Sequence, residues 1–506
     1  MKKWIGFLCA AAVTLFLSAT AVVADIGDSG FFGGITEGRR LPKTTEVLLA
    51  QAASSNTNNQ TELPYSEVIF LAGEPVTFTG TLVIRPSGAV ADGQDVGSYR
   101  VTYTVRGSDS TTGDASIARN ITFNVNWRRQ DNQIVRDYTV NSWTETISAG
   151  GQSFQLDRAR SHFDVSILEW KAAGVTYYAG DLSQLAVYRG DSGTSHEVSG
   201  SLYGYETAWS RAEVQRLEGR VYTNSWQMLY EVRPSVSMDK QLQYSANEPT
   251  AISFPGNYRE IMSNQSGLQY NITVLPTQFY GIETSGGATL STYNTFEQLM
   301  APDVSSLKGH FAEADISKLF AMGILDGEVK FFQPNQQITR GQYVTMLVKA
   351  LKLPIDTSYQ TQINKRGAKV SIVFPDVLPE RADYPYIMAA YKAGLAIGRG
   401  NGQFYVDSII PRDEAIVMLV RALGLTNLGL EPTPITPFTD DARVPAWAKK
   451  DVYAAARIGI VRGDARGNFN PSNPVSKAEA AALVNRLVEY MRTGLRNDYS
   501  EYIVNY

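Results

Sequence analysis

The chain of 506 residues has very little of the side-chain chemistry that metal sites and thiol enzymes use. It contains one cysteine, Cys9, and three histidines that stand far apart in the sequence, at positions 162, 196 and 310. Neither a Cys/His cluster at metal-ligand spacing nor a Gly-x-Ser-x-Gly motif is present. These absences exclude zinc-dependent and cysteine-dependent chemistry, and we expect no metal and no cofactor. Because glycosidase carboxylates leave no local sequence signature, the expectation of a non-enzymatic protein rests on the missing motifs alone.

Long runs of one charge sign or of apolar residues are also scarce. The formal net charge is −4 and no long basic run occurs, so we do not expect nucleic acid as a partner. After the first 24 residues, no stretch reaches the roughly 18 consecutive apolar residues of an ordinary membrane span. We therefore expect a mature protein that is soluble or attached to a surface.

The N-terminus has the pattern of a secretion signal. Lys2 and Lys3 precede an uncharged run from Trp4 to Val23, and the small residues near Ala24 suit cleavage before Asp25. We predict that residues 1–24 are a signal peptide, and a retained membrane anchor is the alternative because the run is almost long enough to span a bilayer. Since Cys9 lies in this segment, the mature protein would have no disulfide and would depend on packing.

The region from 63 to 300 has the apolar alternation of β-strands. Residues 25–62, rich in small and polar residues, are predicted to be a leader or linker. Alternating patterns such as Val76–Ile84 and Ile121–Trp127, separated by turn-forming residues, are typical of antiparallel sandwiches. A break near residues 179–181 divides the region into two sandwich-like domains, 63–180 and 181–300. One larger β domain is the alternative.

The C-terminal part contains a threefold internal repeat. Each copy has a Gly-x-x-x-Gly segment, an aromatic residue five or six positions later, and a cation eight positions beyond the aromatic. The glycine segments are Gly323–Gly327, Gly394–Gly398 and Gly459–Gly463, the aromatics are Phe332, Phe404 and Phe469, and the cations are Arg340, Arg412 and Lys477. Three copies in the same order make coincidence improbable.

Each copy is predicted to be a helix, a glycine-containing loop and a second helix. The second helices begin at Thr339, Pro411 and Ser476, residue types that suit a helix N-terminus. Because one such unit cannot bury its apolar face alone, we expect an all-α module with a shared, pseudo-threefold core. The predicted boundaries are 302–370 with an inserted loop, 371–436 and 437–492, followed by a tail, 493–506.

Several motifs resemble those of S-layer homology repeats. Ile338–Gln342, Ile410–Glu414 and Val475–Glu479 are similar to the family motif Ile-Thr-Arg-Ala-Glu. Gly309–Ala312 and Pro445–Ala448 are similar to the segment His-Trp-Ala that opens a helix, and Phe374–Val377 and Phe438–Asp440 to the segment Phe-x-Asp-Val. The resemblance covers the chain from about residue 302 to residue 492.

The resemblance implies binding of secondary cell-wall polymers, often pyruvylated, in grooves between repeats. Carried over by position, the three cations would pair with an acidic group, Phe311 and Trp447 would stack on sugars, and Gly327, Gly398 and Gly463 would line the grooves. The alternatives are structural ion pairs for the cations, turn geometry for the glycines and core burial for Trp447. Because Ala382 replaces the aromatic of the second repeat and Lys477 replaces an arginine, we expect the repeats to contribute unequally.

These patterns predict a secreted bacterial surface protein of the S-layer type, anchored non-covalently to the cell wall. Its expected partner is a secondary wall polymer or peptidoglycan, and self-assembly is a further expectation. The alternative function is a wall-anchored, carbohydrate-binding adhesin or polysaccharide-active enzyme whose activity lies in the β-rich region.

Overall fold

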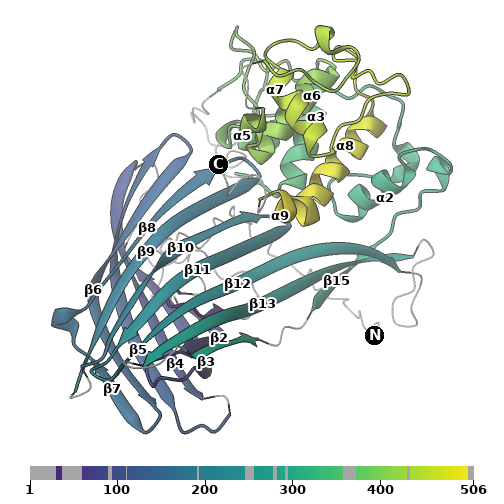
Figure 1. Cartoon of the computed structure of the whole chain (residues 1–506). Helices are drawn as coiled ribbons and strands as arrows, with labels where there is room; N and C mark the ends of the chain where they lie inside the picture. The colour runs from purple at the N-terminus through teal and green to yellow at the C-terminus, as the bar shows by residue number, and fades with distance from the viewer. Residues whose placement is uncertain are drawn as a thin grey trace, which may run out of the picture.

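The protein consists of a large curved β-sheet and a helical module that packs against one end of it (Figure 1). The computed structural model describes residues 30–36, 60–88, 94–109, 111–190, 193–245, 256–276, 282–290, 294–356, 372–429 and 433–499. The β-rich N-terminal region and the helical C-terminal region agree with the prediction. The predicted signal peptide lies outside the described residues, as does most of the predicted insertion.

All the described strands belong to one sheet of fifteen, and most of them pair with their neighbours in the sequence. The hydrogen-bonded order is β1-β2-β3-β4-β5-β6-β7-β9-β10-β11-β12-β13-β14, while β8 pairs with β6 and β9 and β15 pairs with β13. The bounds are β1 Ile35–Thr36, β2 Thr61–Ile69, β3 Val76–Ser87, β4 Val96–Asp109, β5 Ser116–Gln130, β6 Gln133–Ala149, β7 Gln152–Leu156, β8 His162–Lys171, β9 Val175–Arg189, β10 Ser195–Thr207, β11 Ser210–Tyr222, β12 Trp226–Ser245, β13 Asn257–Pro276, β14 Ile282–Thr289 and β15 Thr295–Met300.

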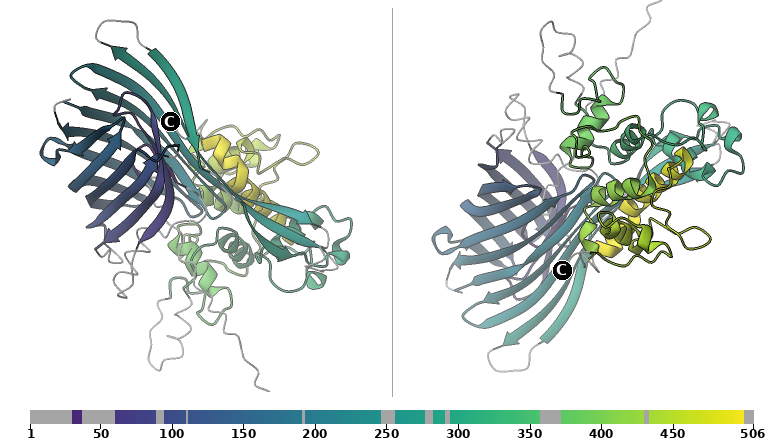
Figure 2. Two further views of the ribbon diagram at one scale, coloured as in Figure 1. Left: turned by 90° about the horizontal axis from the view of Figure 1, so that it is seen from below. Right: turned by 90° about the horizontal axis from the view of Figure 1, so that it is seen from above.

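The sheet curves strongly, so that its early strands lie behind its late strands (Figures 1 and 2). Side chains alternate along each strand, as in β5, where Ile121, Phe123 and Val125 are buried and their neighbours are not. The inward-facing residues of early and late strands meet in one core, which joins Phe123 to Leu202 of β10. Period-two alternation therefore gives one apolar face, and the curvature buries it against itself.

The structure corrects the predicted division into two sandwich-like domains. Strand β9 runs without a break through residues 179–181, and the two halves share one sheet and one core. Gly180 pairs with Ile167 of β8 and Leu202 of β10, and a Cβ atom there would lie 2.4 Å from the carbonyl oxygen of Ser166. The glycine thus serves the close approach of two strands rather than a turn.

Part of the predicted leader lies inside the sheet. Phe31 is 1% exposed and makes edge-to-face contacts with Tyr103, Phe123 and Tyr138 at ring-centroid distances of 5.9, 6.1 and 5.3 Å. A Cβ atom at Gly34 would lie 2.2 Å from the hydroxyl oxygen of Tyr65, so only glycine fits. The prediction of a linker was wrong for residues 30–36, because the two phenylalanines outweigh the small residues around them.

The helical module contains paired helices whose ends agree with the predicted ones. The helices are α2 Glu313–Ala321, α3 Arg340–Ala350, α5 Tyr384–Lys392, α6 Arg412–Leu423, α7 Lys449–Arg457, α8 Lys477–Glu489 and α9 Leu495–Asp498. The N-cap residues of α3, α6 and α8 are Thr339, Pro411 and Ser476. The glycines after α2, α5 and α7 have φ values of 68°, 68° and 75°, a conformation that favours glycine.

The extended segments before α3, α6 and α8 form a closed cycle of hydrogen bonds. The amide of Ile338 donates to the carbonyl of Val475 (2.9 Å), that of Val475 to Ile410 (3.1 Å), and that of Ile410 to Ile338 (3.2 Å). The N-terminal ends of α3, α6 and α8 therefore meet around a common point, and each repeat contacts both others.

The opposite ends of the same three helices dock on the sheet. The carbonyl groups of the last residues of α3 and α6, and that of Met491 in the π-helix that follows α8, accept hydrogen bonds from sheet residues. The Trp209 indole donates to the Ala350 carbonyl oxygen at 2.8 Å, the Tyr177 hydroxyl donates to Leu423 at 2.9 Å, and the Ser210 hydroxyl donates to Met491. Residues at this end of the sheet, namely Val175, Tyr177, Tyr205 and Trp209, consequently belong to the core of the module.

The first part of the predicted tail belongs to this interface. After α8, a π-helix at Tyr490–Gly494 and α9 bring Tyr499 against the sheet. The Tyr499 ring stacks on Tyr177 at 5.8 Å, and its hydroxyl donates to the carbonyl oxygen of Tyr178 at 3.1 Å. Residues 493–499 are thus part of the packed structure. The module is attached to the sheet through the C-terminal ends of its central helices and also through this segment.

Candidate functional site

The three predicted cations occupy equivalent places, one at the start of each central helix. Arg340, Arg412 and Lys477 are the first residues of α3, α6 and α8. Their backbone amides donate to a loop carbonyl of another repeat, namely Ser408 (2.8 Å), Asn473 (2.9 Å) and Gln336 (2.8 Å). Each cation thus lies at a contact between two repeats. In the first site Arg340 contacts the second repeat, in the second site Arg412 contacts the third repeat, and in the third site Lys477 contacts the first repeat.

In the first site the cation is already neutralised. The Arg340 side chain is 6% exposed, and its Nη1 atom lies 2.5 Å from Oε2 of Glu414. Its Nη2 atom donates to the Ile397 carbonyl oxygen at 2.9 Å, and its guanidinium lies 4.9 Å from the ring centroid of Phe404. Burial lowers the pKa of Arg340, and the Glu414 carboxylate opposes that shift. Glu414 also binds Arg399 at 2.5 Å, so one carboxylate holds two guanidinium groups.

In the second site the cation has no carboxylate partner among the described residues. Arg412 is half-buried over the Phe469 ring, 5.4 Å from its centroid, and donates to the Arg462 carbonyl oxygen at 3.2 Å. Its Nε atom is buried without a hydrogen-bond partner within the described part of the chain. Burial lowers the pKa of Arg412, with nearby Glu479 acting in the opposite direction. The half-buried guanidinium therefore carries a positive charge that no described carboxylate compensates.

The third site has a lysine in the equivalent place. Lys477 is half-buried, and its ammonium group makes no hydrogen bond or ion pair with the residues that the structure describes. At the position of repeat 1 that corresponds to Glu414, the chain has Gln342, whose side chain is neutral and bonded to the Thr339 amide at 3.2 Å. The third site therefore also offers an uncompensated positive charge.

The two candidate sugar-stacking aromatics are on the surface. Phe311 is 70% exposed and Trp447 is 57% exposed, so the alternative of core burial for Trp447 is wrong. Phe311 belongs to the repeat that receives Lys477, and Trp447 to the repeat that receives Arg412. Ala382 is the exposed residue at this position of the repeat that receives Arg340. The site with a compensated cation is thus also the site without an aromatic.

Glycine is required at the three candidate positions for different structural reasons. Gly327 has a φ of 88° and open space around it, whereas a Cβ atom at Gly398 would lie 2.8 Å from the Phe374 ring. A Cβ atom at Gly463 would lie 2.9 Å from the backbone of Gly467. Turn geometry and close packing account for all three glycines.

Two carboxylates that shape the sites were missed by sequence reasoning. Asp376 accepts hydrogen bonds from the amides of Phe404 (2.8 Å) and Tyr405 (2.5 Å), and Asp440 from those of Phe469 (2.7 Å) and Asn470 (2.8 Å). They hold the loops that place an aromatic ring under Arg340 and Arg412. The Phe-x-Asp segments carried this signal. In the first repeat Asp303 instead bonds its own neighbour, Ser305, at 2.9 Å.

Comparison with known protein families agrees with this geometry. The model of the S-layer homology domain matches residues 302–344, 373–416 and 437–481. The chain carries three S-layer homology domains. Each match includes one cation and the preceding loop, and the module marks a secreted protein of the bacterial cell surface.

Relatives with this similarity are S-layer proteins and polysaccharide-degrading enzymes. The chain is 32% identical over 184 residues to an S-layer protein of Bacillus thuringiensis subsp. finitimus, which is 36% of this chain and 20% of that protein. It is also 29% identical over 228 residues to an amylopullulanase of Thermoanaerobacterium thermosulfurigenes, 44% of this chain and 12% of the enzyme. The chain thus spans a fifth or less of these relatives.

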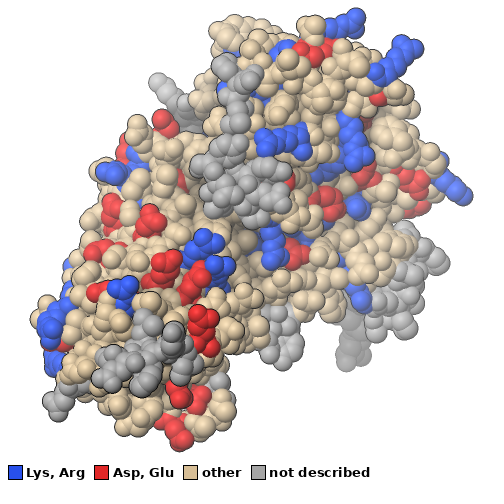
Figure 3. Space-filling view, viewed as in Figure 1, with Lys and Arg blue, Asp and Glu red and all other residues tan. Residues whose placement is uncertain are grey.

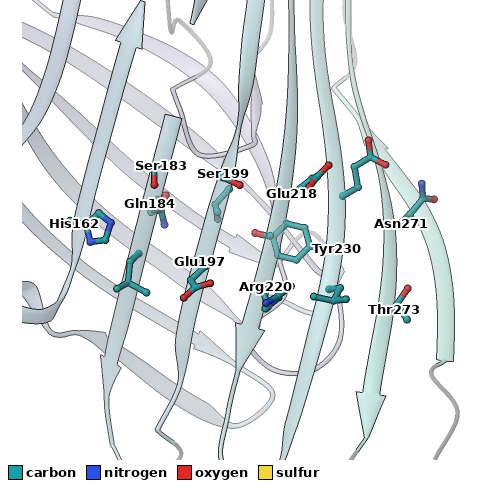
Figure 4. A pocket seen from close by; sticks show the side chains of 15 residues that line it. His162, Ser183, Gln184, Glu197, Ser199, Glu218, Arg220, Tyr230, Asn271 and Thr273 are labelled. Atoms are coloured by element: carbon teal, nitrogen blue, oxygen red, sulfur yellow. The ribbon is translucent and has the colours of Figure 1, made fainter. Parts of the chain in front are cut away.

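A second concave surface lies on the outer face of the sheet, remote from the S-layer homology repeats in sequence. It has a volume of about 720 Å³ and crosses strands β8 to β13 (Figure 4). Exposed polar side chains line it, including those of His162, Glu197, Glu218, Arg220 and Asn271. Glu218 faces Glu231 across β11 and β12, and Arg233 compensates Glu231 at 2.5 Å.

Among the described residues, no group of His, Cys, Asp and Glu could hold a metal ion, and none of the described helices has the length and apolar character of a membrane span. On the face shown in Figure 3, basic and acidic side chains are interspersed rather than gathered by sign. The inter-repeat cations therefore remain the candidate site with the clearest chemistry.

Proposed function

We propose that the protein is anchored non-covalently to the cell wall by S-layer homology repeats that bind an acidic, pyruvylated secondary polysaccharide. The observation that carries this proposal is the pair of uncompensated cations, Arg412 and Lys477, at helix N-termini. A carboxylate there would meet a cation and the positive end of a helix dipole. Arginine additionally offers two parallel donors to a carboxylate.

The neighbouring aromatics support a sugar ligand. Trp447 and Phe311 are exposed on the repeats that receive these two cations. An exposed aromatic ring is stabilised when an apolar ligand face covers it and displaces water. Pyranose rings have such faces. We also infer a pseudo-threefold core for the module, which the closed cycle among Ile338, Ile410 and Val475 supports.

The docking of the module on the sheet indicates at which end of the module the wall ligand binds. The cations begin α3, α6 and α8, and the sheet contacts the other ends of these helices. Helices of 11 to 13 residues are roughly 16–20 Å long at about 1.5 Å per residue. We infer that the wall ligand binds at the end of the module remote from the sheet, and that the non-enzymatic sheet extends outward and self-assembles.

The test is sedimentation of the full chain with purified cell walls. Arg412→Ala and Lys477→Ala should each weaken binding about 10- to 100-fold, because a charged hydrogen bond contributes roughly 1.5–3 kcal/mol. Lys392→Ala is the matched control, since this cation of α5 is 65% exposed and belongs to no inter-repeat site. Undiminished binding of both site variants would contradict the proposal. Equal binding to walls stripped of secondary polymer would indicate peptidoglycan as the ligand.

A second candidate function is polysaccharide binding by the sheet. The cavity of about 720 Å³ with exposed polar groups from several strands favours it. A glycan array on the full chain would detect binding, and Glu218→Gln with Arg220→Ala should abolish a signal that comes from this surface. Release of sugars from a bound polymer would instead identify an enzyme and overturn the non-catalytic proposal.

A further inference from the structure

Besides the aromatic position, the three inter-repeat sites differ in a second residue of the receiving repeat. This residue is the third of each central helix, and it is Gln342, Glu414 or Glu479. In the first site Glu414 binds the incoming Arg340 at 2.5 Å. In the second site burial lowers the pKa of the incoming Arg412; the charge of Glu479 opposes that shift, but Glu479 makes no ion pair with Arg412. The side chains of Glu414 and Glu479 thus have different partners, although the two residues occupy equivalent places in their repeats.

The N-cap residue explains the difference. Ser476 holds Glu479 in a capping box: its amide and its hydroxyl donate to the Glu479 carboxylate at 2.8 and 2.9 Å. Thr339 and Gln342 also form a capping box, in which the Thr339 amide donates to the Gln342 side-chain oxygen at 3.2 Å. Pro411 has neither a backbone N–H nor a side-chain oxygen, so it cannot engage Glu414. The carboxylate of Glu414 is consequently free to turn to other donors.

The donors that Glu414 finds are those of the first site. One carboxylate oxygen binds Arg340 and the other binds Arg399, both at 2.5 Å. The Arg340 side chain is closed off from solvent, whereas Arg412 remains half-exposed and has no carboxylate partner among the described residues. The carboxylate of Glu414 therefore occupies the place in which an acidic ligand group would meet the guanidinium.

We propose that the first site is a latent binding site for a carboxylate-bearing sugar, occupied by the protein's own Glu414, so that the chain binds two acidic groups instead of three. This inference rests on the proposed wall-binding function. Ala382 fits it, because the self-occupied site also lacks the aromatic that a sugar would stack on. Pro411 is responsible for this occupation, because it cannot form a capping box and so leaves Glu414 available to pair with Arg340.

The experiment is calorimetric titration of the full chain with a methyl hexoside that carries a 4,6-pyruvate ketal. The methyl ester of the same compound is the uncharged control. Wild type should bind two equivalents, and Glu414→Gln should bind three, the added site being about tenfold weaker because it lacks a stacking partner. Pro411→Ser should also reach three, since it restores a capping box and removes Glu414 from Arg340. Glu479→Gln, the matched change in the second site, should stay at two.

The outcomes separate the two proposals. Three equivalents for wild type, or two for both Glu414→Gln and Pro411→Ser, would overturn the latent site and leave wall binding intact. No binding by wild type, with the protein shown to be folded by circular dichroism, would contradict the proposed function itself. Pro411→Ser keeps every charge, so a gain in that variant cannot come from the loss of a carboxylate.

Discussion

The sheet and the helical module treat charged side chains in opposite ways. Inside the sheet, Arg119 is buried with two carboxylates, Glu67 at 2.8 Å and Glu145 at 2.5 Å, and Arg136 is buried with Glu169. In the module, Arg412 and Lys477 have no carboxylate partner among the described residues. Buried charges must be paired to be tolerated, whereas water can solvate a half-exposed cation that has no partner in the protein. Compensation, more than residue type, distinguishes a structural cation from a binding one.

The first inter-repeat site resembles the sheet in this respect. Arg340 has the same position in its repeat as the proposed ligand-binding cations, but its burial and its pairing with Glu414 are those of a structural arginine. A family motif thus locates the position, and the partners decide what the residue does there. The following predictions test this distinction.

The largest expected effect is on the buried charge cluster of the sheet. Arg119→Ala leaves Glu67 and Glu145 buried without their cation, and should lower the free energy of unfolding by about 3–5 kcal/mol. Denaturant titration measures this loss. Arg100→Ala, at an exposed position of the same sheet that bonds Asn124, should change stability by less than about 0.5 kcal/mol. Equal effects of the two changes would remove the contrast.

The second prediction concerns pH. His196 is half-buried beside Tyr230, and its partial burial lowers its pKa from 6.5 to about 4. Below pH 6.5 the unfolded chain takes up the proton and the folded one does not, so stability is lost as the pH falls from 6.5 to 4. The expected loss from this group is roughly 2–3 kcal/mol. Unfolding of His196→Asn at both pH values should show a smaller loss than wild type, and an equal loss would contradict it.

The third prediction tests the docking of the module on the sheet. Trp209→Phe keeps most of the buried area but removes the hydrogen bond to Ala350, which leaves that carbonyl unsatisfied. We expect a loss of about 1–2 kcal/mol. Limited proteolysis should then release the module from the sheet sooner. Trp226→Phe, at a half-buried position whose indole has no such role, is the control.

The smallest expected effect on stability converts the second site into a copy of the first. Ser476→Pro removes the capping box, at a cost of about 1 kcal/mol, and frees Glu479 to pair with Arg412. Thermal unfolding measures the cost. Binding to purified walls should fall about tenfold, as for a lost cation. Wall binding equal to that of wild type would show that Glu479 does not reach Arg412.

The sequence predicted the helical module in detail because its repeats show the same signals three times. The glycines at the helix ends and the N-caps Thr339, Pro411 and Ser476 act locally, within one helical turn. The partners of the cations act across repeats, so the pairing of Arg340 with Glu414 followed only from the structure.

The sheet was predictable as β-structure but not as one sheet. Alternation fixes which residues face a core, as in β5, but it does not say which strands share that core. Gly180 was taken for a break because glycine serves both turns and close strand contacts. The burial of Phe31 depends on partners from distant strands, which no local pattern contains.

The docking of three helix ends on the sheet has a mechanical consequence. If the wall is held at Arg412 and Lys477, as proposed above, a pull on the sheet passes along α6 and α8 to the contacts of Tyr177 and Ser210, while Trp209 holds the end of α3. Two load paths in parallel would then share the force. The anchor is therefore stiff, and the orientation of the sheet relative to the wall is set by the fold itself.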